Sequence, residues 1–86
     1  MKSFSLSILA VDQVCYQGSA IACSVRSVTG WRTFEAHHEP FVSVLVSGVV
    51  SVLEEGGGRF SLEIQDGLVR FESNSCLLLV TTSGSD

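Results

Sequence analysis

The sequence predicts an all-β domain, a small antiparallel β-sandwich (flattened barrel) of about nine to ten short strands. Apolar residues recur at every second position through most of the chain, and Gly, Asp or Asn interrupts the alternation at short intervals. No segment repeats with the 3.6-residue period of a helix. Because successive side chains of a strand point to opposite faces, this pattern indicates short strands with one buried face. Such strands, joined by tight turns, are typical of a two-layer sandwich.

Three strands are expected before residue 30. The first begins at Phe4 and alternates with serine, and a turn at Asp12 separates it from a strand over 14–17. A bend at Gly18 leads to a strand over 20–28, which Gly30 ends. The side chains expected to point into the core are Phe4, Leu6, Ile8, Ile21, Cys23 and Val25.

The remaining strands follow from Pro40 onward. Proline has no amide hydrogen to donate, so Pro40 belongs at the start of a strand over 41–46. A strand over 49–53 pairs back after Gly48, and the glycine-rich stretch 54–58 is a hairpin turn. A strand over 60–65 follows, Asp66 and Gly67 signal another turn, and strands over 69–71 and 76–80 flank a turn at 73–75. We expect one domain over residues 1–81 and a polar, disordered tail over 82–86, with Phe60, Leu62, Ile64, Val69 and Phe71 inside.

Composition argues against several classes of function. The 86 residues carry five Lys and Arg against nine Asp and Glu, so there is no cationic surface for nucleic acid or anionic lipid. No run approaches the roughly 20 apolar residues that span a bilayer, so membrane association is expected only through a partner. Cys15, Cys23 and Cys76 form no Cys-x-x-Cys pair, which suits inert thiols in a reducing compartment.

No catalytic, metal or cofactor site is predicted, and we expect no enzymatic activity. His37 and His38 are adjacent, so in extended chain their side chains point in opposite directions and cannot readily share a metal ion. The many serines lack a Gly-x-Ser-x-Gly context. The glycines at 56–58 lack the lysine and helix of a phosphate-binding loop.

Two strands, 41–46 and 76–80, are apolar on both faces, although a strand in a sandwich has only one inner face. Either loops of the domain cover the second face, or a partner protein does. On the first of these strands, the face expected to meet a partner carries Phe41, Ser43 and Leu45.

The segment 31–39 is expected to form a contact loop. A tryptophan beside an arginine, with a phenylalanine two residues on, is typical of interface hot spots. The alternative is that the tryptophan packs on the edge of its own sandwich. The candidate partner-binding residues of this segment and its boundary are Trp31, Arg32, Phe34, Glu35, His38, Glu39 and Pro40.

The spacing of Gly18, Gly30, His38, Pro40 and Gly48, with Gly67 and Asn74 downstream, resembles the amino-terminal β-sandwich domain of the F-type ATP synthase epsilon subunit. That family's loop reads roughly Gly-Glu-Leu-Gly-Ile-Leu-Pro-Gly-His-Ala-Pro. The resemblance runs from about residue 4 to residue 80 and does not include the family's carboxy-terminal helices, so regulation by those helices is not expected here.

The resemblance implies a non-catalytic subunit of the rotating central stalk, coupling the gamma subunit to the c ring of a proton- or ion-translocating synthase. It implies that one side of the sandwich packs on gamma and that the loop bearing His38 faces the ring. This sequence departs from the family at Trp31, where the family has an acidic residue, and at Glu39, where alanine is usual. A peripheral complex on the cytoplasmic side of a bacterial-type membrane, or in the equivalent organelle compartment, is the implied location. The alternative is a stand-alone adaptor or ligand-binding module with an unrelated partner.

Overall fold

The computed structural model describes residues 2–82 and contains seven strands in that range. In chain order, they are β1 (Phe4–Ala10), β2 (Gln13–Ser27), β3 (Gly30–Glu35), β4 (Phe41–Leu45), β5 (Gly48–Glu54), β6 (Arg59–Glu72) and β7 (Ser75–Thr82). The all-β class is therefore confirmed. The described residues include no helix, and so none long and apolar enough to cross a membrane.

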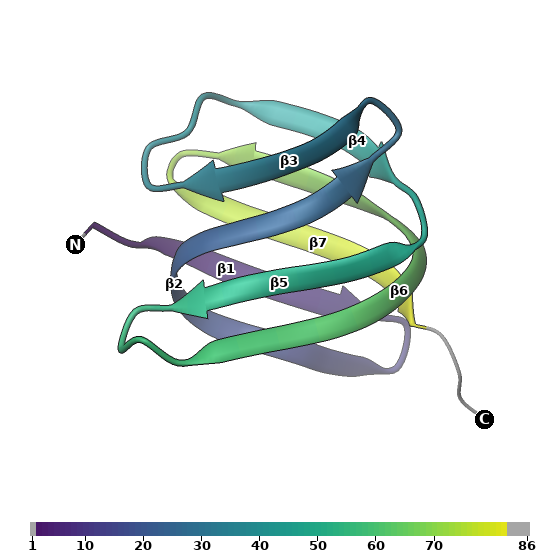
Figure 1. The fold of residues 1–86 in the computed structure, drawn as a ribbon, viewed down its shortest axis with the longest axis horizontal. Helices are drawn as coiled ribbons and strands as arrows, with labels where there is room; N and C mark the ends of the chain where they lie inside the picture. The colour runs from purple at the N-terminus through teal and green to yellow at the C-terminus, as the bar shows by residue number, and fades with distance from the viewer. Residues whose placement is uncertain (1, 83–86) are drawn as a thin grey trace.

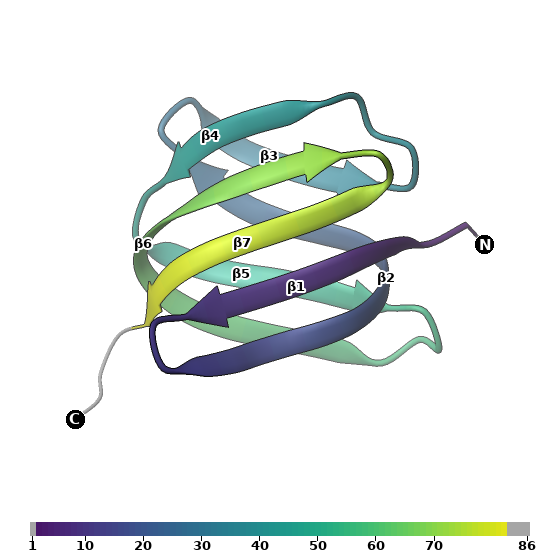
Figure 2. The same ribbon diagram turned by 180° about the vertical axis from the view of Figure 1, so that it is seen from behind.

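The strands form two layers that share two long members (Figures 1 and 2). The first sheet contains β3, the second half of β2, β5 and the first half of β6. The second sheet contains β4, the second half of β6, β7, β1 and the first half of β2. β2 and β6 therefore pass from one sheet to the other and close the sandwich along two sides.

These two long strands explain why the predicted strand count was too high. Gly18 and the Asp66-Gly67 pair were expected to reverse or bend the chain between separate strands. Instead, Gly18 lies within β2, and Asp66 and Gly67 lie within β6. The pairing register shifts nearby, between Ala20 and Ala22 and between Ile64 and Asp66. Bulges of this kind bend a strand without ending it.

A second difference concerns strand direction. The sandwich was expected to be antiparallel, but β1 pairs with β7 in parallel, with Ser5 opposite Ser75 and Leu9 opposite Leu79. All other pairings are antiparallel. The first and last strands therefore lie side by side at the middle of the second sheet (Figure 2). Thr82 belongs to β7 rather than to a tail, and the rest of the predicted tail lies outside the described residues.

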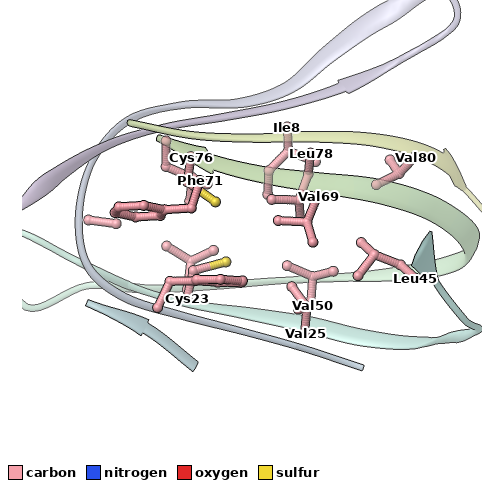
Figure 3. Close-up of a cluster of buried hydrophobic side chains, with 14 of the residues drawn as sticks. Ile8, Cys23, Val25, Leu45, Val50, Val69, Phe71, Cys76, Leu78 and Val80 are labelled. Carbon is pink, nitrogen blue, oxygen red and sulfur yellow. The ribbon is translucent and has the colours of Figure 1, made fainter. Parts of the chain in front are cut away.

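The core lies between the sheets and includes most of the side chains that the alternation placed inward, together with Phe34 and Leu45, which were expected to contact a partner (Figure 3). Phe60 and Leu62, also expected inside, are half-buried and pack against it. Phe4, Leu6 and Ile8 of β1 are at most 2% exposed. From the second sheet, Phe71 stacks on Phe34 of the first, with ring centres 5.7 Å apart and planes only 10° from parallel. The other buried members are Ala20, Cys23, Val25, Leu45, Val50, Val52, Ile64, Val69, Cys76, Leu78 and Val80. Ile21 was expected inside but is only half-buried, because the β2 register shift falls beside it.

Candidate interaction surfaces

The outer side of the second sheet carries an uncovered apolar surface. We call it the apolar face and define it as Leu9, Val42, Val44, Leu68, Leu77 and Leu79. Val42 is 69% exposed, and Val44, Leu68 and Leu79 are each 45–49% exposed. Exposed single aliphatic side chains are ordinary, but a contiguous set on one sheet marks an interaction surface.

Strand register aligns the apolar face into a row that crosses the strands. Val44 lies opposite Leu68, Leu68 opposite Leu79, and Leu79 opposite Leu9. Val14, which is 59% exposed, continues the row opposite Leu9. One row further along the strands, Val42 lies opposite Arg70, and Arg70 opposite Leu77. The apolar surface is thus one row that crosses five strands, with Val42 and Leu77 beside it on either side of Arg70.

A groove of about 530 Å³ runs beside this row. Its lining includes Val44, Leu68, Leu79 and Leu9 of the row, together with Asp66, Thr81 and Val11. Gly67 lines its floor, and a Cβ atom there would lie 2.5 Å from the carbonyl oxygen of Leu79. Glycine therefore permits β6 and β7 to approach each other closely beneath the groove.

The outer side of the first sheet differs at the corresponding place. Its central row consists of hydroxyl side chains, with Thr33 opposite Ser24, Ser24 opposite Ser51, and Ser51 opposite Ser61. The Ser24 and Thr33 hydroxyl oxygens are 2.9 Å apart and hydrogen-bonded. This face is suited to contact with water.

The turn 36–40 forms a second candidate surface at one end of the sandwich. The His38 ring packs edge-on against Phe34 at 5.0 Å and Phe71 at 5.5 Å between ring centres. Its Nδ1 lies 2.6 Å from the carbonyl oxygen of Glu39, so the nitrogen must donate and carries the hydrogen. His38 is half-buried and anchors the turn, while Glu39 and Pro40 are exposed.

Asn74 joins this turn to the neighbouring β6–β7 turn. The His37 amide donates to Asn74 Oδ1 at 2.7 Å, and Asn74 Nδ2 donates to the Ser3 carbonyl at 3.1 Å. His37, Ser73 and Asn74 are the non-glycine residues with positive φ among those described. Residues with positive φ other than glycine are uncommon and cluster where surrounding contacts hold them.

The structure separates the predicted contact residues into exposed and buried ones. Trp31 is 63% exposed, and Glu35 is exposed at the end of β3. The Arg32 guanidinium lies over the Phe41 ring at 5.1 Å and donates to Thr29 Oγ1. Residues 31–35 therefore form strand β3 rather than a loop, and only 36–40 is a connection.

Phe34 and Leu45 cannot contact a partner, because both side chains are buried in the core. The prediction that Phe41, Ser43 and Leu45 form the outer side of β4 is wrong, because Leu45 is buried and the other two are half-buried on the same side of the strand. Those residues point inward, and the uncovered side carries Val42 and Val44. A serine usually indicates the solvent side of a strand, but half-buried Ser43 satisfies its hydroxyl locally by donating to the Val44 carbonyl.

Leu9, Leu68, Leu77 and Leu79 were not named as contact residues. Part of the signal was present in the sequence, since the segment 76–80 was noted as apolar on both faces, and Leu79 is indeed exposed. Leu68 gave no such signal because Asp66 and Gly67 before it were interpreted as a turn.

The cysteine side chains belong to the core. Burial raises the pKa of Cys23 to about 12. The pKa of Cys76 is raised further, first by burial and then by the nearby Cys23. At neutral pH, both remain protonated. Within residues 2–82, no three His, Cys, Asp or Glu side chains converge as a metal site would require.

Comparison with known proteins gives the family. A model of the ATP synthase delta/epsilon chain β-sandwich domain matches residues 3–83. The ATP synthase epsilon chain of Bartonella quintana is 29% identical over 80 residues, covering 93% of this chain and 57% of the relative. That of Ruminococcus albus is 24% identical over 83 residues, covering 96% and 61%. The chain thus spans about three fifths of these relatives' length.

Solved structures share the fold. A chain of the Euglena gracilis mitochondrial ATP synthase superposes with a TM-score of 0.81 at 23% identity, covering 95% of this chain and 51% of that one. A chain of the Tetrahymena thermophila mitochondrial ATP synthase central stalk and c-ring gives 0.75 at 11% identity, covering 93% and 64%. With a family model matching nearly its whole length and a sandwich of the same shape, this chain belongs to the ATP synthase delta/epsilon chain β-sandwich family.

Proposed function

We propose that this domain is a non-catalytic part of the rotating central stalk of an F-type ATP synthase, where it couples the gamma subunit to the c ring. It would catalyse no reaction itself and would reach the membrane only through the complex. Its place would be the cytoplasmic side of a bacterial-type membrane or the equivalent organelle compartment. The observation that carries this proposal is the uncovered apolar face on a domain of this family.

The two candidate surfaces suit two different partners. The apolar face offers aliphatic area that a stable subunit contact buries, and we assign it to gamma. The turn 36–40 lies at one end of the sandwich, next to the β6–β7 turn, and we assign it to the c ring. Packing of His38 among aromatic rings and the hydrogen bond from Asn74 hold this turn in place. A turn with a fixed conformation can keep two subunits in one relative orientation while torque is transmitted between them.

Reconstitution of the stalk with single variants tests this assignment. Val44→Glu should reduce gamma association because binding would desolvate an unpaired charge. His38→Ala, in the turn 36–40, should leave gamma association nearly unchanged and reduce attachment to the c ring. Ser51→Glu, on the hydroxyl row of the first sheet, is the matched control. If wild-type protein associates with neither gamma nor the ring, the proposed function is wrong.

A further inference from the structure

We infer that the element of the partner that meets the apolar face is a single amphipathic α-helix lying across the strands, acidic along one flank and basic along the other. This inference rests on the proposed function, because it names the chemistry of the gamma segment that would occupy the face. It follows from three properties of the surface: its shape, the pairing of its strands and the charges beside it.

The first property is direction. The row from Val44 to Val14 crosses five neighbouring strands, and at about 4.8 Å per strand it is about 19 Å long. The groove of about 530 Å³ is lined by row residues from four of these strands, Val44, Leu68, Leu79 and Leu9. A helix rises about 1.5 Å per residue, so about 13 residues would match the row. The surface is therefore long and narrow, as one helix requires.

The second property is that the strands beneath the face offer no free backbone. β7 is paired with β6 on one side and with β1 on the other, and β6 is paired with β4 and β7 over the same residues. An added strand would find no unpaired amides or carbonyls at the centre of this face. Recognition must use side chains alone, which fits the apolar stripe of a helix.

The third property is a pair of opposite charges on either side of the row. On β6, Asp66 and Arg70 lie two residues before and after Leu68, so along the strand they are about 13 Å apart. A helix with side chains is about 10–12 Å wide and fits between them. A second sheet packed here would cover both charges, at the cost of desolvating them.

These two charges also determine which charged residues the helix needs along its flanks. Neither Asp66 nor Arg70 forms an ion pair in the part of the chain that the structure describes. A helix with an acidic residue facing Arg70 and a basic residue facing Asp66 would satisfy both. The reverse arrangement would place like charges together and is disfavoured. Because the apolar stripe fixes which side of the helix faces the sheet, the two charges select the direction in which the helix runs along the row.

Hydrogen exchange of the gamma subunit from the same organism, alone and bound to this protein, tests the inference. We expect one protected gamma segment of about three to four turns, with apolar residues spaced i, i+3, i+4 and i+7. Leu68→Glu and Leu79→Glu should weaken gamma binding about tenfold or more and remove that protection. Asp66→Lys and Arg70→Glu should each weaken it about two- to fivefold, less in high salt. Arg59→Glu, on the half of β6 that belongs to the first sheet, should have no effect.

The possible outcomes separate this inference from the proposed function. If wild-type protein does not bind gamma, the proposed function fails, and the inference fails with it. If gamma binds but the protected segment is an extended strand, or Leu68→Glu and Leu79→Glu bind normally, the inference is wrong and the proposed function stands. If the apolar face instead joins two copies of this chain while gamma binds elsewhere, the inference is also wrong. Melting curves of both glutamate variants should match wild type, because both positions are nearly half exposed.

Discussion

Across the middle of the first sheet run four hydroxyl side chains, from Thr33 to Ser61, whereas four aliphatic ones, from Val44 to Leu9, cross the second sheet. Both rows lie on the outer side of their sheets, and both sheets bury an apolar inner side. The requirement for a core therefore explains why both inner sides are apolar. It does not explain why one outer side is polar and the other apolar. That difference indicates an occupant for the second sheet and contact with water for the first.

The largest effect is expected when the same charge is placed on one side or the other of β4. Leu45→Glu should leave little folded protein, because Leu45 is 1% exposed and burying an unpaired carboxylate costs several kcal/mol. Val44→Glu, one residue away on the open side, should keep the fold. Urea unfolding of both variants measures this. Equal stability would mean that the inner and outer sides of β4 are assigned incorrectly.

A smaller effect is expected from glycine substitutions. Gly67→Ala places a Cβ atom 2.5 Å from the Leu79 carbonyl oxygen and 3.2 Å from the Val80 Cα. We expect it to lower the free energy of unfolding by about 1–3 kcal/mol as the backbones separate. Gly48→Ala is the control, since its Cβ would meet Arg26 at an ordinary 3.5 Å. Urea titration compares the two, and a neutral Gly67→Ala would contradict the close approach of β6 and β7.

An intermediate effect is expected when the side chains of the two rows are exchanged. Leu68→Ser with Leu79→Ser gives the second sheet a hydroxyl row like that of the first. We expect about a tenfold loss in gamma affinity, about 1.4 kcal/mol, with little loss of stability. The reciprocal variant, Ser51→Leu with Ser61→Leu, should not create gamma binding on the first sheet. Titration calorimetry with purified gamma measures both, and unchanged affinity in the serine variant would contradict the assignment.

The pH dependence of stability tests the thiols of Cys23 and Cys76, which face each other from the two sheets. Cys23 has a pKa of about 12 in the folded domain and near 9 when unfolded, and that of Cys76 is also raised. Below pH 9, the thiols are protonated in both states, so their contribution to stability is complete. Between pH 9 and 12, only the unfolded chain loses these protons, so stability should fall by about 1.4 kcal/mol per pH unit per thiol.

Two measurements check this prediction. Unfolding midpoints from pH 8 to 11 should decline less steeply in Cys76→Ala than in wild type. At pH 8, a thiol reagent should modify half-buried Cys15 without denaturant and reach Cys23 and Cys76 only on unfolding. Rapid modification of all three in the native state would show that the core thiols are not protected.

Sequence periodicity predicted the inner sides well and the strand boundaries less well. Phe4, Leu6, Ile8, Val69 and Phe71 all lie in the core, because burial on one side of a strand leaves a direct two-residue signal. Periodicity could not predict that β2 and β6 each continue from one sheet into the other. Glycine serves equally for a turn and for a bend within a strand, and only the partner strands distinguish the two uses.

The sequence predicted an apolar contact surface that includes β4, but it assigned that surface to the wrong side of the strand. A strand that is apolar on both sides does not indicate which side is inner, and in β4 the only polar residue, Ser43, points inward. The side is set by pairing with β6, where Val69 and Phe71 fix the inner parity. The row itself joins residues from five strands, so it emerges only from the register between strands distant in the sequence.

The parallel pairing of β1 with β7 has a mechanical consequence. The start of β1 and the end of β7 lie at opposite ends of the same pair of neighbouring strands (Figure 2). A force that pulled on these two points would load the hydrogen bonds between β1 and β7 together, in shear, instead of opening them one at a time. The domain should therefore resist extension along this axis more strongly than extension applied across a hairpin such as β6 and β7. Its stiffness depends on direction, and the stiff direction is set by where the chain enters and leaves the second sheet.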